Sequence, residues 1–69
     1  MKSNYAIIFH TQSDYEAAFS IIKSLNPDDI DSEEIEMGWE SERGRRRAIN
    51  ELRKIGIEVD TYNKYDRMW

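Results

Sequence analysis

The chain has 69 residues, of which 35% are charged, with no cysteine and one histidine. A chain of this length forms at most one domain, which we place over residues 1–69, and without thiols it has no disulfide and no cysteine-bound zinc. No calcium-loop motif is present, and no apolar run approaches the roughly 20 residues of a membrane span or forms a signal-peptide core, so we expect a cytoplasmic protein without a metal or other cofactor.

The first expected element is a strand over residues 5–9, which is apolar at every position. A strand that is apolar on both faces is typical of the centre of a sheet. The larger side chains at its odd-numbered positions are predicted to fill the core. The smaller Ala6 and Ile8 are predicted to lie on the opposite, open face, together with Tyr62 from the last strand. That uncovered apolar face predicts a cover, either the tail through Tyr65, Met68 and Trp69 or a second subunit. Of these we expect a homodimer, with the tail contributing to the contact.

A helix is expected over residues 14–25. Ser13 and Glu16 form the capping-box pattern at its start. Asn26 suits the left-handed position after its last turn, and Pro27 prevents its continuation. Apolar residues spaced three and four apart form one stripe along it: Tyr15, Ala18, Phe19, Ile22 and Leu25.

Residues 28–34 are predicted to be an acidic connection, and residues 34–40 a second strand. Ile35, Met37 and Trp39 alternate with glutamates there, which indicates one apolar and one solvated face. The charge on the solvated face favours an edge position, because charged side chains protect an edge strand against pairing.

A second helix is expected over residues 42–55, and Gly56 is expected to end it. Its apolar stripe is Ala48, Ile49, Leu52 and Ile55. Alternation of apolar and polar residues over 57–62 predicts a third strand, and residues 63–69 form a short tail.

The element order β-α-β-α-β predicts an α/β (α+β) protein with a truncated ferredoxin-like fold, in which a three-stranded sheet carries two helices on one face. A right-handed crossover would make the first two strands parallel. The third strand would return antiparallel on the other side of the first.

The charge is divided along the chain. Residues 1–42 contain two basic and ten acidic residues, a net charge of −8, whereas residues 43–69 contain eight basic and four acidic residues, a net charge of +4. A division of this kind often marks a face for a partner or for the other half of the same chain.

The clearest candidate site is an arginine cluster at the start of the second helix, made of Arg43, Arg45, Arg46 and Arg47. Cations at a helix N-terminus oppose the helix dipole, so folding alone does not require them there. A bound anion or acidic partner would reverse that penalty. The simpler interpretation is internal neutralisation by the eight acidic residues between positions 28 and 42.

Four aromatic residues are candidate interface residues: Trp39, Tyr62, Tyr65 and Trp69. Tryptophan and tyrosine are enriched at interface hot spots, although in so small a domain they equally suit the core. The turn at His10 and Thr11 follows a strand, where α/β proteins often bind ligands. No second histidine or cysteine completes a catalytic set, so we interpret this turn as structural.

The segment from Tyr5 to Asp14 and the later segment from Leu52 to Glu58 resemble small sulfur/selenium-carrier-like domains. The shared pattern is a strand ending in Phe-His, a Ser-Asp helix start and a late helix leading into a Gly-Ile-Glu strand. Those domains carry a Cys-Gly element before the second helix, where this chain has Met37-Gly38-Trp39. The resemblance therefore implies the fold and not the carrier chemistry.

Small size, acidity and the lack of a catalytic set favour a non-enzymatic protein-binding module, a regulator or inhibitor of the kind that phages and mobile elements encode. The alternative is an anion or nucleic-acid binder that uses the arginine cluster. The negative net charge disfavours nucleic acid, because such proteins normally carry a domain-wide basic surface.

Overall fold

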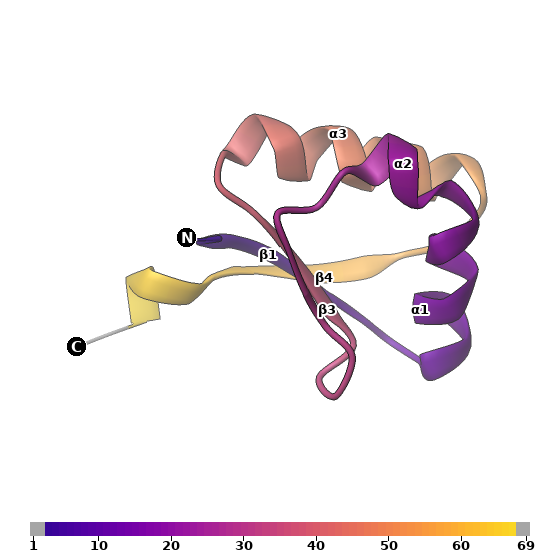
Figure 1. Ribbon diagram of the computed structural model, residues 1–69, viewed down its shortest axis with the longest axis horizontal. Helices are drawn as coiled ribbons and strands as arrows, with labels where there is room; N and C mark the ends of the chain where they lie inside the picture. Colours follow the sequence, from indigo (N-terminus) through magenta and orange to yellow (C-terminus); the bar gives the residue numbers. More distant parts are fainter. Residues whose placement is uncertain (1–2, 68–69) are drawn as a thin grey trace.

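The computed structural model describes residues 3–67, and side chains are described as far as residue 65. The elements in chain order are β1 (Tyr5–Phe9), α1 (Gln12–Ala18), the 3₁₀ turn η1 (Phe19–Ile21), α2 (Ile22–Leu25), β2 (Asp29–Asp31), β3 (Glu36–Trp39), α3 (Glu42–Lys54), β4 (Val59–Asn63) and the 3₁₀ turn η2 (Lys64–Arg67). Figure 1 shows α1, α2 and α3 on one side of the sheet, so the protein is a mixed α+β domain. The predicted contribution of Trp69 to an interface lies outside the described residues.

The sheet has four strands in the order β2-β3-β1-β4, and every neighbouring pair is antiparallel. The central position of β1 and the antiparallel return of the last strand beside it are confirmed. The prediction of three strands is wrong, because β2 forms within the segment expected to be a loop. The predicted parallel pairing of β1 with the strand at residues 34–40 is wrong for the same reason: the crossover ends in β2, and a hairpin then reverses the chain into β3.

The β2–β3 hairpin makes β2, and not β3, the acidic edge of the sheet. The Asp31 carboxylate accepts the backbone N–H groups of Glu33 and Glu34 at 3.0 and 3.2 Å, which closes the turn through a side chain. Ile35 has a φ of 48°, an unusual conformation for a β-branched residue. Its side chain packs against the core and its carbonyl accepts the Phe9 N–H at 3.0 Å, so contacts with β1 hold it there.

The helical segments and one sheet face enclose the hydrophobic core. The strand register places Ile7, Phe9, Met37 and Trp39 on that face, as the odd-numbered pattern of β1 predicts. They pack with residues from the helices and from the β4 approach: Tyr15, Ala18, Leu25, Ala48, Leu52 and Ile57. Burial of this apolar surface is the main source of stability in a domain without disulfides.

The first helical segment differs from its prediction at the start and in the middle. Thr11, and not Ser13, is the N-cap, and its hydroxyl accepts the Asp14 N–H at 3.0 Å. The helix tightens into η1, where the Ser20 hydroxyl donates to the Ala17 carbonyl at 2.7 Å, a bond that often bends helices. The predicted left-handed Asn26 is confirmed, with a φ of 47°.

The helix α3 agrees with its prediction except at its end. The Ser41 hydroxyl caps it by accepting the Gly44 N–H at 3.1 Å. Ile55 was expected in the apolar stripe, but it is exposed, because the chain turns away at Gly56, whose φ of 81° confirms the predicted stop. The last strand begins at Val59, two residues later than predicted.

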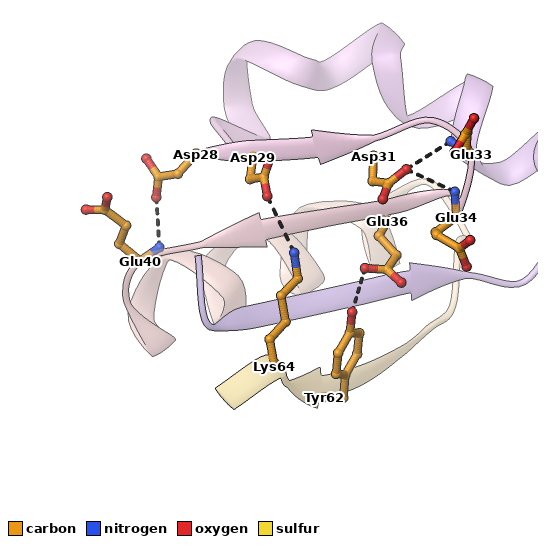
Figure 2. A network of polar contacts seen from close by, with 9 residues as sticks. All are labelled: Asp28, Asp29, Asp31, Glu33, Glu34, Glu36, Glu40, Tyr62 and Lys64. Atoms are coloured by element: carbon orange, nitrogen blue, oxygen red, sulfur yellow. Dashed lines mark hydrogen bonds and ion pairs between the residues drawn. The ribbon is translucent and has the colours of Figure 1, made fainter. Parts of the chain in front are cut away.

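The open face of the sheet carries Ala6, Ile8 and Tyr62, as predicted, but polar contacts cross it. The Tyr62 hydroxyl reaches from β4 over β1 and donates to Glu36 on β3 at 2.6 Å. Lys64 reaches across the same face to Asp29 on β2 at 3.4 Å (Figure 2). Ala6 is fully buried on this face, so the chain itself, through Tyr62 and through Lys64 of the expected tail, covers part of the face for which the tail or a second subunit was the expected cover.

The N-terminal segment also lies close to the open face. A Cβ at Gly38 would come within 2.9 Å of the Ser3 side chain, so only glycine fits there without a shift. Ser3 itself is 3% exposed.

Candidate partner-binding surface

The structure divides the arginine cluster among different directions around α3. Arg45 points to β4, Arg46 lies on the β4 side with more of its surface in water, and Arg47 lines a small hollow on the α2 side. Arg43 lies outside both hollows and is exposed. Consecutive residues on a helix are about 100° apart, so a run of arginines cannot form one patch.

Arg45 has a structural role. Its guanidinium donates to the Tyr62 carbonyl at 3.1 Å and to Asn63 Oδ1 at 2.8 Å. The same group lies 5.4 Å from the centre of the Tyr5 ring, within range of a cation–π contact. These contacts join α3 to β4 and β1, so the expectation that folding does not require the cluster fails for this one member.

An open hollow of about 390 Å³ lies between α3 and β4, and we call it the α3–β4 hollow. It is lined by Arg45, Arg46, Ile49, Asn50, Arg53 and Thr61, together with Glu42. Three guanidinium groups therefore face one carboxylate, and that carboxylate is 3.5 Å from Arg46 in an exposed i,i+4 pair. The hollow has an excess of positive charge beside the apolar side chain of Ile49, and its guanidinium groups suit an anionic group.

The sequence interpretation missed Arg53, Asn50 and Thr61. A signal for the first two was present, because residues 46, 50 and 53 follow the three- and four-residue spacing of one helix face. Thr61 joins them only through tertiary structure, since the sheet order brings the edge of β4 beside α3.

A second, smaller hollow of about 140 Å³ lies where α3 approaches the end of α2. Its lining includes Arg47 and Asp28 as charges of opposite sign, along with Asn26 and Ser24. Within residues 3–67, the side chains of Arg43 and Arg47 take part in no hydrogen bond or ion pair. Mixed charge and small volume make this hollow a weaker candidate than the α3–β4 hollow.

The acidic segment at positions 28–42 does not neutralise the arginines. Asp28 accepts the Glu40 N–H at 2.8 Å, and the other contacts of this segment in Figure 2 lie within the hairpin or on the open face. Among the described residues, Glu42 is its one member paired with an arginine. The simpler interpretation of the cluster, internal pairing, therefore fails for all but Arg46.

The candidate aromatic residues also differ in burial and position. Trp39 is 3% exposed, and its indole N–H donates to the Leu25 carbonyl at 2.8 Å, so the interface prediction is wrong and Trp39 is a core residue. Tyr62 is half-buried on the open face. Tyr65 is 47% exposed at the start of η2, where its backbone N–H donates to Asn4 Oδ1 at 2.7 Å.

The turn after β1 shows no catalytic grouping. Thr11 caps α1, and His10 lies 3.4 Å from Asp60 in an exposed contact. Among residues 3–67, no group of three or more histidine, aspartate or glutamate side chains is arranged to hold a metal ion. No helix in the same range is long and apolar enough to cross a membrane.

Comparison with protein-family models, with curated proteins and with solved structures found no match to this chain.

Proposed function

We propose that this chain is a small non-enzymatic binding protein that acts through protein–protein contact, and that the α3–β4 hollow with its arginines is the contact surface. The partner supplies an acidic segment. The observation that carries this proposal is the separation of charge: apart from Glu42, the paired carboxylates of the acidic segment lie within the hairpin and on the open face. Arg53, and Arg46 with only its exposed pair to Glu42, therefore remain accessible to a partner.

The arrangement of the sheet supports a ferredoxin-like fold as part of the same proposal. Helical connections join β1 to β2 and β3 to β4, and the order β2-β3-β1-β4 is antiparallel throughout. A β-α-β-β-α-β chain with such a split arrangement is the pattern of ferredoxin-like domains. The strand that the sequence interpretation lacked is β2, so the proposed fold is not truncated.

A catalytic role has less support than a binding role. His10 is exposed beside one carboxylate, and within residues 3–67 no serine or threonine hydroxyl is hydrogen-bonded to a histidine, aspartate or glutamate side chain. A regulatory or inhibitory protein needs a specific surface and no reacting group, which agrees with the site described above.

The test is photo-crosslinking in living cells. A photoreactive amino acid replaces Asn50, which is exposed in the α3–β4 hollow, and in a control replaces Glu33, which is exposed on the β2–β3 hairpin. Each is combined with Arg46→Glu and Arg53→Glu. The matched charge control is Arg43→Glu with Lys54→Glu, because both residues are exposed and lie outside the hollow.

We expect the probe at position 50 to form a protein adduct whose attached peptide, identified by mass spectrometry, is acidic. The adduct disappears with Arg46→Glu and Arg53→Glu and persists in the charge control. A nuclease-sensitive adduct at position 50 would instead establish the alternative, nucleic-acid binding. Protein adducts formed only from position 33 would place the partner on the acidic hairpin and overturn the proposal.

A further inference from the structure

The free edge of β4 presents backbone hydrogen-bonding groups. The Phe9 N–H donates to the Ile35 carbonyl at 3.0 Å on the β3 side of β1. Because the residues of a strand bond alternately to its two sides, the even-numbered residues of β1 bond to β4. The register then directs the N–H and C=O groups of Val59 and Thr61 to the free edge. The described part of the chain has no strand beyond β4.

The α3–β4 hollow lies along the same edge. Thr61 pairs with Ile7 in the register, so its side chain is on the helix-covered face, where it lines the hollow with Arg46 and Arg53. A strand added beside β4 would send every second side chain to that face. Those side chains would meet guanidinium groups, which form strong, charge-assisted hydrogen bonds with carboxylates.

Charge distinguishes the possible occupants of this edge. A second copy paired through its own β4 would bring two sets of hollow-lining arginines towards each other. A second copy paired through β2 would place Asp29 and Asp31 on the open face beside Asp60, where like charges repel. An extended segment of another protein with carboxylates at alternate positions has neither conflict.

We propose that an extended acidic segment of a partner protein adds to β4 as a fifth strand, with alternate carboxylates in the α3–β4 hollow. This inference rests on the proposed function and specifies how the contact is made. Backbone bonds to Val59 and Thr61 supply affinity, and Arg46 and Arg53 select acidic side chains.

The probe is a blocked octapeptide of alternating glutamate and threonine, labelled with a fluorophore and titrated with the protein while anisotropy is measured. A control peptide has the same side chains but is N-methylated at every residue, which removes its amide donors, including those that would face β4, without changing its charge. A second control replaces each glutamate with lysine. We expect binding of the first peptide, at least tenfold weaker binding of the N-methylated peptide, and no binding of the lysine peptide.

The protein variants are Thr61→Pro and, as the matched control, Thr61→Val. Proline removes an N–H that points away from β1, so it takes no bond from the sheet, whereas valine keeps that N–H. We expect Thr61→Pro to weaken peptide binding at least tenfold and Thr61→Val to leave it within twofold. Circular dichroism establishes that each variant is folded.

Amide hydrogen exchange of the unmodified chain tests the contact even if Thr61→Pro does not fold. The peptide should slow exchange at Val59 and Thr61, while Asp60 and Tyr62, which already bond to β1, stay unchanged. Binding without this alternation, or equal binding by folded Thr61→Pro, overturns strand addition and leaves a contact through side-chain charge alone. Absence of peptide binding also overturns strand addition, and cross-linking at position 50 then decides the proposed function separately.

Discussion

The acidic segment and the arginine cluster are adjacent in the sequence but serve the fold in different ways. Asp28 and Asp31 accept backbone N–H groups, Asp29 pairs with Lys64, and Glu36 accepts the Tyr62 hydroxyl. The acidic segment therefore organises the hairpin and spans the open face (Figure 2). In the arginine cluster, Arg45 alone bonds to another element of the described chain.

The contrast follows from backbone chemistry. A carboxylate beside a turn or strand end finds backbone N–H donors within a few residues, so short acidic side chains are readily used locally. An arginine near a helix N-terminus has no acceptor of that kind, because the free groups there are donors. Its guanidinium must reach another element, as that of Arg45 does, or face the solvent. A guanidinium group that faces the solvent in this way is available to a partner.

The largest expected effect is the loss of Arg45. Arg45→Ala removes two hydrogen bonds to β4 and the contact with the Tyr5 ring, and it leaves the Asn63 side chain without this donor. We expect the free energy of unfolding to fall by about 2 kcal/mol, measured by urea denaturation. The control Arg43→Ala, at an exposed position, should change it by less than about 0.5 kcal/mol. Equal losses in the two variants would contradict the division of the cluster.

The next effect concerns the open face. Tyr62→Phe removes the hydroxyl that donates to Glu36 at 2.6 Å and keeps the ring over the sheet. Because the acceptor is a carboxylate and half-buried, we expect a loss of about 1.5 kcal/mol. The matched control is Tyr5→Phe, since the Tyr5 hydroxyl makes no hydrogen bond within residues 3–67 and its ring stays beside Arg45. The measurement is urea denaturation. A loss of stability confined to Tyr62→Phe supports the hydrogen bond from Tyr62 to Glu36, whereas an unchanged unfolding midpoint would mean that packing alone covers this face.

Local patterns in the sequence were sufficient to predict most of the residues on the helix-covered face of the sheet. Alternation in β1, the stripe of α3 as far as Leu52 and the stops at Asn26 and Gly56 each express an interaction between near neighbours, and each is present. The strand β2 escaped prediction because three residues, two of them aspartates, give no apolar alternation. Its pairing with β3 depends on the hairpin turn, which the Asp31 side chain closes.

The candidate surface was predictable in part. The arginine cluster is visible in the sequence, but which member folds inward depends on where β4 lies relative to α3. That position is set by the pairing of Tyr5 with Asn63, residues 58 positions apart, and no local pattern encodes it. The open face shows the same limit: Ala6 and Ile8 were placed correctly, whereas the polar bridges above them join residues on β2, β3, β4 and η2.

A smaller effect is expected at the second bridge of the open face. Lys64 and Asp29 are 3.4 Å apart, and the Asp29 side chain is 53% exposed, so solvent screens the pair. Lys64→Met keeps the aliphatic stem that crosses the sheet and removes the charge. We expect a loss of about 0.5 kcal/mol at low salt that disappears at about 1 M salt, where the Debye length is only about 3 Å. A loss of the same size at both salt concentrations would assign the effect to packing.

The smallest effect is expected at Arg46, although this residue is central to the proposed contact. Arg46→Gln removes the exposed i,i+4 pair with Glu42 at 3.5 Å, which is worth about 0.4 kcal/mol, and it also removes a cation from the N-terminal half of α3, where the helix dipole opposes it. These terms have opposite signs, so the unfolding midpoint in urea should be nearly unchanged. Arg45→Gln, the matched substitution one residue earlier, should lower it clearly because its bonds to β4 are lost. A large destabilisation by Arg46→Gln would make Arg46 part of the folded framework, and the contrast between acids bonded within the fold and arginines left to a partner would no longer hold.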